Sequence, residues 1–225
     1  MILLKDVWYL YGEKPAIKEI NLTLKDDITY IIGPNGSGKT TLLKVSSLIF
    51  RPTRGEVLYN GENPWRDKRK LLKLRKKVVY VHEKPILLRG TVIDNVAFPL
   101  VLRGYTPSDA KDRAREILRE IGLESIENKR RRELSAGQAQ LVSLCRALIL
   151  DAEYIFLDEP TNMLDIENRE KIIELIGKKK AKKIIATHDL ALPLQLTGRI
   201  LLIKDGKLWG EITLGEYRSM FLNIH

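Results

Sequence analysis

The chain has very little cysteine and no long hydrophobic run. Its single thiol, Cys145, excludes an internal disulfide and is typical of a reducing cytosol. No apolar stretch approaches the roughly 18 residues that span a bilayer. The first residues carry neither the basic leader nor the small-residue cleavage site of a signal peptide. We therefore expect a soluble protein that stays where it is made, with Cys145 as an inert core thiol among apolar neighbours.

Aromatic residues are also scarce, at 7% of the chain, whereas the formal net charge is +10. That charge permits nucleic acid or an anionic membrane surface as a partner. Much of it lies in two runs, residues 66–77 and 178–183, and neither run interleaves aromatic side chains that could stack on bases. The runs favour a solvated helix face and a charged turn, so no nucleic-acid partner is expected.

A glycine-rich loop separates the apolar, β-type segment 28–32 from the helix-compatible residues 42–45. It fits the pattern G-x-x-x-x-G-K-[ST], whose backbone N–H groups wrap a di- or triphosphate at a helix N-terminus. On this interpretation Lys39 reaches the β- and γ-phosphates and the Thr40 hydroxyl is a ligand of Mg²⁺. Nucleotide binding is the working hypothesis. The predicted phosphate-binding residues are Gly33, Pro34, Asn35, Gly36, Ser37, Gly38, Lys39, Thr40 and Thr41.

Two acidic residues, Asp158 and Glu159, directly follow the apolar segment 154–157. As structure alone, such a pair is a solvated turn. Beside a phosphate loop the pair gains a chemical role, because Asp158 can hold the Mg²⁺ water shell while Glu159 polarises the attacking water.

Two further predicted strands end in titratable side chains. Residues 183–187 lead to His188, and residues 77–81 lead to His82 and Glu83. In doubly wound sheets, ligands bind at the edge formed by the carboxyl ends of the strands. A single histidine is usually a core or surface residue, but this one ends a core strand where a γ-phosphate could lie.

Residues 84–150 change to helical character. The segments 91–102 and 107–121 predict helices, the second amphipathic. Ser135 then predicts a helix N-cap, and Gln138, three residues later, completes a capping box. This gives a second helix N-terminus that can hold an anion.

Residues 166–176 predict a further, charged helix. Five more segments predict strands, which suit a chain long enough to bury a core with one subdomain. Tyr11 lies in a turn between the first two of them. It is either a surface residue that covers a hairpin or an aromatic that stacks on adenine. The predicted strands are residues 2–10, 17–24, 56–59, 200–203 and 208–212.

Taken in order, these segments resemble the nucleotide-binding subunit of ABC transporters over essentially the whole chain. The stretches that carry the resemblance are GPNGSGKTT, LSAGQ, YIFLDEP with NMLD, and ATHD. The resemblance implies an α/β fold and a single ABC ATPase domain over residues 1–225. A P-loop NTPase (RecA-like) core with an antiparallel β subdomain would comprise residues 1–83 and 151–225. An inserted α-helical subdomain, 84–150, would carry the signature motif.

The resemblance also implies roles for single residues. Tyr11 would stack on the adenine ring. Ser135 and Gly137 would contact the γ-phosphate of ATP held by the opposite subunit, with Gln138 in the same ATP-binding motif. Asp165 would lie at the subunit contact.

Two motifs depart from the family pattern. Glu83 stands where the family has a glutamine that touches Mg²⁺ and the membrane partner, and His82 precedes it where an aromatic is usual. A carboxylate can still ligate Mg²⁺, but it adds negative charge near the phosphates. Ala136 stands where the first glycine of the signature is normal, and since its backbone N–H survives we expect function to be retained.

The implied function is ATP hydrolysis that drives solute transport. Lys39, Glu159 and His188 would be catalytic, with Mg²⁺ held by Thr40, Glu83 and Asp158. ATP would favour a head-to-tail homodimer, or a dimer with a paired cassette. An integral-membrane permease would hold the protein at the inner face of the cell membrane.

The lack of a regulatory domain suggests an importer, which leaves an extracytoplasmic solute-binding protein as a further partner. The stretch YVHEKPILL resembles ATPases of oxyanion importers such as those for tungstate. An exporter subunit stays open.

Two other classes remain as alternatives. A cassette ATPase acting on nucleic acid or ribosomes would suit the positive charge, but such relatives carry two cassettes or a long coiled coil. The interval between Lys39 and Ser135 has no sustained heptads. A P-loop kinase for a small molecule would leave the signature and His188 unexplained.

Overall fold

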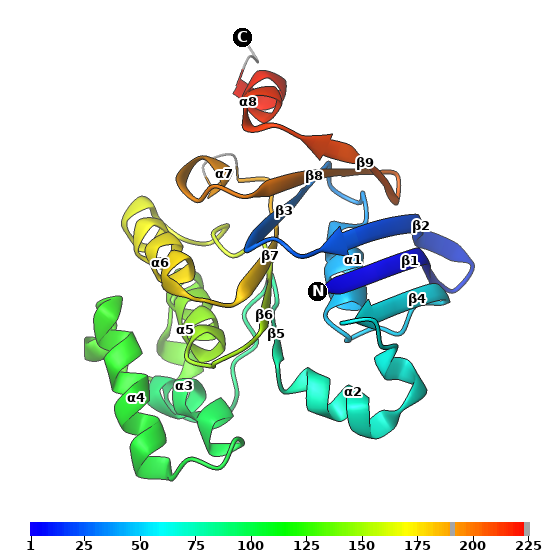
Figure 1. Ribbon diagram of the computed structural model, residues 1–225. Helices are drawn as coiled ribbons and strands as arrows, with labels where there is room; N and C mark the ends of the chain where they lie inside the picture. The colour runs from blue at the N-terminus through cyan, green and yellow to red at the C-terminus, as the bar shows by residue number, and fades with distance from the viewer. Residues whose placement is uncertain (190–191, 223–225) are drawn as a thin grey trace. The chain divides into compact units, whose positions relative to one another are not determined.

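The computed structural model describes residues 1–189 and 192–222 (Figure 1). Its contacts divide the chain into a core unit and a helical unit. The core unit comprises residues 1–80, 152–159 and the described residues from 180 onward. The helical unit comprises residues 81–151 and 160–179. The sequence places only 84–150 in the helical part, whereas the contacts also group 160–179 with it, because the helix in that segment packs on another helix of this unit.

Two sheets are built from the strands shown in Figure 1. The first is antiparallel, with the order β2-β1-β4. Its strands are β1 (Ile2–Tyr11), β2 (Lys14–Leu24) and β4 (Arg54–Tyr59). The second has the order β5-β6-β7-β3-β8-β9. Its strands are β3 (Ile28–Ile32), β5 (Val78–Val81), β6 (Tyr154–Asp158), β7 (Lys182–Ala186), β8 (Arg199–Lys204) and β9 (Lys207–Ile212).

The strands β3, β6 and β7 are almost entirely buried and run parallel. Continuous apolar runs are typical of parallel strands covered on both faces. Ala186 is the partner of both Ile31 and Asp158. The carboxyl ends of the three strands therefore meet at one edge, as the sequence predicts.

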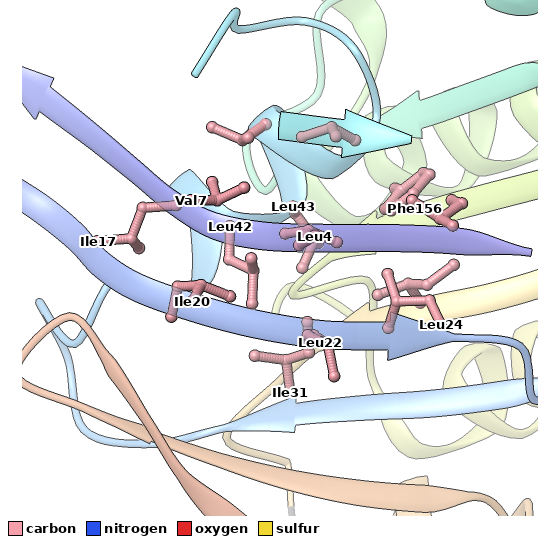
Figure 2. Packing of buried hydrophobic residues seen from close by; sticks show 14 of the residues in the cluster. Leu4, Val7, Ile17, Ile20, Leu22, Leu24, Ile31, Leu42, Leu43 and Phe156 are labelled. Atoms are coloured by element: carbon pink, nitrogen blue, oxygen red, sulfur yellow. The ribbon is translucent and has the colours of Figure 1, made fainter. Parts of the chain in front are cut away.

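The core of this unit lies where the antiparallel sheet packs on α1 (Lys39–Ser46). Figure 2 shows alternate side chains of β2, Ile20, Leu22 and Leu24, in one apolar cluster that also contains Leu42 and Leu43 of this helix. The alternation puts every second residue on one face of the strand. Burial of this face holds the phosphate loop, which lies between β3 and α1, on a rigid support.

The helical unit contains four longer helices. Two of them begin with a capping box, at Thr91 and at Ser135, in which the N-cap hydroxyl and the N3 side chain satisfy each other's backbone N–H. Gly122 adopts a left-handed φ of 74° just past the second helix. The helices are α3 (Val92–Val101), α4 (Pro107–Glu120), α5 (Ala136–Leu148) and α6 (Ile166–Lys178).

Several boundaries differ from the sequence prediction. β1 continues to Tyr11, which leaves only Gly12 and Glu13 in the turn. α1 begins at Lys39, inside the glycine-rich motif, because the loop itself closes onto the helix. The basic run 66–77 contains the exposed α2 (Lys68–Arg75), as predicted. Two helices lack a periodic signal long enough to predict, α7 (Leu192–Gln195) and α8 (Leu214–Leu222). Within the described residues, none of the helices has the length and apolar character to cross a membrane.

Candidate functional site

The loop between β3 and α1 depends on two glycines. Gly33 has φ 152° and Gly38 has φ 104°, values that side chains rarely allow. A Cβ on Gly33 would lie 2.0 Å from the Ile203 carbonyl oxygen, and a Cβ on Gly38 would lie 2.6 Å from the Ala16 oxygen. The loop is therefore pressed against β8 on one side and against the β1–β2 hairpin on the other.

Lys39 is held inside this loop and is only 7% exposed. Its Nζ donates hydrogen bonds to the carbonyl oxygens of Gly33, at 2.9 Å, and Pro34, at 3.2 Å. An ammonium has three donors, so one stays available for an anion. A positive charge thus lies within the curve of the loop.

The donors around the loop fit a phosphate group. The first N–H groups of a helix have no acceptor within it, and here they follow residues of left-handed φ, Gly36 and Gly38. Ser37 Oγ is buried and has no hydrogen-bond partner in the described part of the chain. A buried hydroxyl without a partner is costly, and a phosphate oxygen would supply the missing acceptor.

Asp158, at the end of β6, is buried, and hydroxyl groups hold both of its carboxylate oxygens. Thr40 Oγ1 donates to Oδ1 at 3.0 Å, and Tyr80 Oη donates to Oδ2 at 2.7 Å. The predicted pair Thr40 and Asp158 is therefore brought together. Tyr80 was not predicted; the only signal was its place near the end of a strand beside β6.

The donor chemistry of this pair fits Mg²⁺, which prefers oxygen ligands and usually binds one or two carboxylates together with waters and phosphates. No group of three or more His, Cys, Asp and Glu side chains that could hold a metal occurs among the described residues. A metal here would therefore share its coordination with a nucleotide. Glu83, the third predicted ligand, belongs to the helical unit and is exposed.

Glu159 and His188 also meet, although 29 residues separate them. Glu159 Oε1 lies 3.0 Å from His188 Nδ1, and Oε2 accepts the His188 backbone N–H at 3.2 Å. Glu159 has a φ of 47°, and its N–H donates to Ala186 O at 2.9 Å. This left-handed conformation, unusual for a non-glycine residue, turns the chain sharply at the end of β6. The Glu159 side chain is 9% exposed and that of His188 is 61% exposed.

A residue of α8 supports the His188 segment. The buried Tyr217 donates its hydroxyl to the Asp189 carbonyl oxygen at 3.2 Å. Burial raises the pKa of Tyr217 to about 12, so the hydroxyl keeps its proton at neutral pH. The sequence carried no local signal for this contact.

Tyr11 is 52% exposed and belongs to a cluster of three aromatic rings. Its ring meets that of Tyr9 edge to face at 5.1 Å, and Tyr9 stacks on Phe50 at 4.8 Å. The β1–β2 hairpin that carries Tyr11 also touches Gly38 through Ala16. Tyr11 is thus a supported, exposed ring on the hairpin beside the phosphate loop, and Phe50 is an unpredicted neighbour.

The signature residues lie at the start of α5 in the helical unit. Ser135 Oγ accepts the Gln138 N–H, and Gln138 Oε1 accepts the Ser135 N–H, both at 3.1 Å. A Cβ on Gly137 would lie 2.9 Å from Met163 O, so this position needs glycine. The methyl group of Ala136 is instead exposed.

Asp165 caps the neighbouring helix α6. Its Oδ1 accepts the Asn168 N–H at 2.9 Å. Hydrogen bonds from Asn168 lower the pKa of the Asp165 carboxyl. The side chain that the resemblance places at a subunit contact is therefore an ionised helix cap.

Fold and geometry together define the class. A phosphate-binding loop with a buried lysine, beside a parallel strand that ends in two carboxylates and a neighbouring strand that leads to a histidine, is the arrangement of a P-loop nucleoside triphosphatase.

Comparison with known proteins narrows this class. The family model described as ABC transporter matches residues 17–162. A putative ABC transporter ATP-binding protein of Pyrococcus furiosus is 35% identical, covering 94% of this chain and 84% of its own. The tungstate uptake system ATP-binding protein TupC of Peptoclostridium acidaminophilum is 34% identical, covering 88% and 92%.

A solved structure agrees with the sequence relatives. A dimeric ATP-binding cassette in a post-hydrolysis state, bound to ADP and Pi, is 33% identical, with a TM-score of 0.84 over 95% of this chain and 99% of that one. The chain belongs to the ABC transporter family, in which it is an ATP-binding subunit and an ATPase.

Proposed function

We propose that this protein couples ATP hydrolysis to solute transport through a head-to-tail dimer of two copies. The observation that carries the proposal is that the hydrolytic groups are joined by direct contacts inside one unit, while the signature helix presents its own exposed N-terminus in the other. The dimeric cassette bound to ADP and Pi, to which this chain is similar, supports closure of two copies around nucleotide.

In the proposed mechanism the phosphate loop binds the β- and γ-phosphates, and Lys39 neutralises their charge. Thr40 and Asp158 would hold Mg²⁺, which polarises the phosphate oxygens when bound. Glu159 orients and deprotonates the attacking water, and His188 stays beside it at the γ-phosphate position. Tyr11 stacks on the base.

The signature completes the site in trans. Ser135 and the α5 N-terminus, with Gly137 and Gln138, supply N–H and hydroxyl donors to the γ-phosphate bound by the opposite copy. Glu83 would supply a carboxylate oxygen to Mg²⁺ and would contact the membrane partner. Asp165 lies at the subunit contact. Loss of the γ-phosphate removes the bridging charge, and the dimer reopens.

The test uses a Glu159→Gln variant, which keeps the size of the side chain and removes the base. We expect turnover to fall by roughly 10²- to 10⁴-fold while ATP binding persists. Light scattering of this variant in MgATP should report a dimer, and in the absence of nucleotide a smaller species. Turnover at the unmodified rate would disprove the role of Glu159, and single chains in MgATP would disprove the dimer.

We further propose that the partner is an integral-membrane permease at the inner face of the cell membrane, in an importer. The similarity to a tungstate uptake ATPase supports an inorganic oxyanion as the cargo, with an extracytoplasmic solute-binding protein as the third component. Identification of the permease that co-purifies with this chain, followed by uptake of labelled tungstate in vesicles, tests this. ATP-dependent efflux would show an exporter instead.

A further inference from the structure

The short helix α2 of the core unit has two faces of different character. On one face, Leu71 and Leu74 are half-buried and pack against the apolar cluster of the core unit. Beside them, Arg75 donates hydrogen bonds to the Leu48 carbonyl oxygen, at 3.1 Å from Nε and 2.8 Å from Nη2. These contacts fix the rotation of the helix about its axis, so its other face is turned to solvent.

The outer face of α2 consists of Lys68, Arg69, Leu72 and Lys73, and all four side chains are exposed. At about 100° per residue, these positions cover roughly 140° of the helix surface. Leu72, which is 52% exposed, lies inside this arc, between Lys68 and Arg69. The outer face is therefore a basic surface with an exposed leucine within it.

The acidic residues near α2 do not neutralise this face. Asp67 caps the helix, and its Oδ1 accepts the Arg69 N–H at 2.8 Å. Glu62 pairs at 2.8 Å with Lys70, which lies outside the arc. Among the described residues, no carboxylate forms an ion pair with a cation of the outer face. The face therefore keeps a positive charge for a partner outside the chain.

A cluster of cations around an exposed leucine fits a bilayer with anionic headgroups. Lysine and arginine are attracted by the negative surface potential of such a membrane, while an apolar side chain between them enters the headgroup region. The cationic side chains are long enough to keep their charges at the phosphates as the leucine enters. A single-stranded nucleic acid would instead use aromatic rings for stacking, and the outer face has none.

We propose that the outer face of α2 binds the surface of an anionic phospholipid bilayer. The inference goes beyond the proposed transport function, because it gives the core unit a lipid partner in addition to the protein partner. An eight-residue helix with one exposed leucine binds lipid weakly by itself. Within an assembly that the permease already holds at the membrane, a weak second contact acts at high effective concentration. It would orient the core unit against the membrane.

The test measures co-sedimentation of the full chain with vesicles of phosphatidylcholine mixed with phosphatidylglycerol. Vesicles of phosphatidylcholine alone are the reference. We expect at least about 10-fold tighter binding to the anionic vesicles, and loss of this preference at about 1 M salt, where the Debye length is about 3 Å. A Lys68→Glu, Arg69→Glu, Lys73→Glu triple variant should bind the anionic vesicles at least about 10-fold more weakly, because each cation near the surface contributes.

The matched control for charge uses a second exposed basic cluster. Four arginines line a groove of about 780 Å³ in the helical unit: Arg89, Arg130, Arg131 and Arg132. An Arg130→Glu, Arg131→Glu, Arg132→Glu triple variant changes the net charge by the same amount as the α2 variant. A flat bilayer contacts the rim of a groove and not its floor, so we expect less than a twofold effect. Equal losses in the two triple variants would show that total charge, and not α2, determines binding, and would overturn the proposal.

Leu72→Gln distinguishes a bilayer from other polyanions, because it removes apolar surface and leaves the charge unchanged. We expect binding to the anionic vesicles to weaken about 3-fold, since membrane affinity scales with the apolar area that is buried. Leu102→Gln, at a position just past α3 that is 69% exposed, is the control and should have no effect. Unchanged binding of Leu72→Gln would overturn the proposal. So would displacement of the vesicles by an oligothymidine, or by millimolar inorganic phosphate at constant ionic strength.

ATP hydrolysis separates this proposal from the transport mechanism. Without vesicles, the α2 triple variant should hydrolyse ATP at the wild-type rate, which also shows that it is folded. If that variant is inactive, the pair Leu72→Gln and Leu102→Gln decides the question. If the dimer test with Glu159→Gln fails while α2 still binds the vesicles, the transport mechanism is wrong and the lipid contact stands. The reverse result removes only the lipid contact.

Discussion

The core unit and the helical unit hold their functional residues in different ways. In the core unit, Thr40 contacts Asp158 and Glu159 contacts His188, so residues far apart in sequence are joined in pairs. In the helical unit, Ser135 and Gln138, three residues apart, cap one helix end through reciprocal hydrogen bonds. A site that hydrolyses a nucleotide needs charged and polar side chains from distant segments held in fixed contact. A surface that binds phosphate through backbone donors needs only a well-capped helix.

The largest expected effect tests how rigidly the core loop is built. Gly33→Ala places a methyl group 2.0 Å from a carbonyl oxygen, so the loop must move or the protein unfolds. We expect ATP binding, measured by calorimetry, to be lost. Gly36→Ala is the control, because Gly36 also has positive φ but no atom within 4 Å of the added group. It should cost only about 1 kcal/mol of stability and retain binding. Equal losses of ATP binding in the two variants would mean that the positive φ, and not the close contact at Gly33, determines binding.

A smaller effect is expected at Tyr80, which orients the carboxylate of Asp158. Tyr80→Phe removes one hydrogen bond to a proposed metal ligand, and loss of such a partner lowers metal affinity by about 10- to 100-fold. ATPase titrated with Mg²⁺ should show a raised half-saturation and a nearly unchanged rate at saturating metal. Tyr59→Phe, a buried tyrosine bonded to Ser46 O, is the control and should leave the Mg²⁺ dependence unchanged.

The signature cap should show a moderate effect. Ser135→Ala removes an N-cap hydroxyl and should cost about 1 kcal/mol in the free energy of unfolding. Thr91→Ala removes the same kind of cap from α3 and should cost a similar amount. In a Glu159→Gln background, only Ser135→Ala should weaken the MgATP dimer seen by light scattering. If Ser135→Ala and Thr91→Ala weaken the dimer equally, the Ser135 hydroxyl acts only through the stability of the folded chain.

The smallest effect concerns pH. The Thr91 hydroxyl and N–H, with a contribution from Lys111, lower the pKa of Asp94 from 3.8 to about 2. A lowered pKa stabilises the folded state above the unfolded pKa, and this stabilisation is lost as pH falls through about 2. Because the side chain is 41% exposed, screening reduces the contribution to about 1 kcal/mol. Urea unfolding should show Asp94→Asn less stable at pH 7, with the difference shrinking below pH 4. A difference that stays constant down to pH 2 would contradict the ionic cause.

Several features of the candidate site were predictable because their signal is local. The Ser135 capping box and the strand–loop–helix order around Lys39 depend on spacings of a few residues. The edge that gathers Asp158, Glu159 and His188 followed from apolar segments ending in polar residues. The missed contacts, Tyr80 with Asp158 and Tyr217 with Asp189, join elements that no sequence spacing connects.

By itself the sequence determined the phosphate loop, the helix caps and the strand ends, since these depend on hydrogen bonds and side-chain periods within one segment. Only the tertiary structure decided which side chains meet across segments. The order of strands in the sheet places Tyr80 on Asp158, and the contact with β8 makes Gly33 indispensable. It also gathers four arginines along one groove of the helical unit, where no carboxylate of the described residues pairs with them. The physical reason is that packing among distant segments, and not local backbone preference, selects these neighbours.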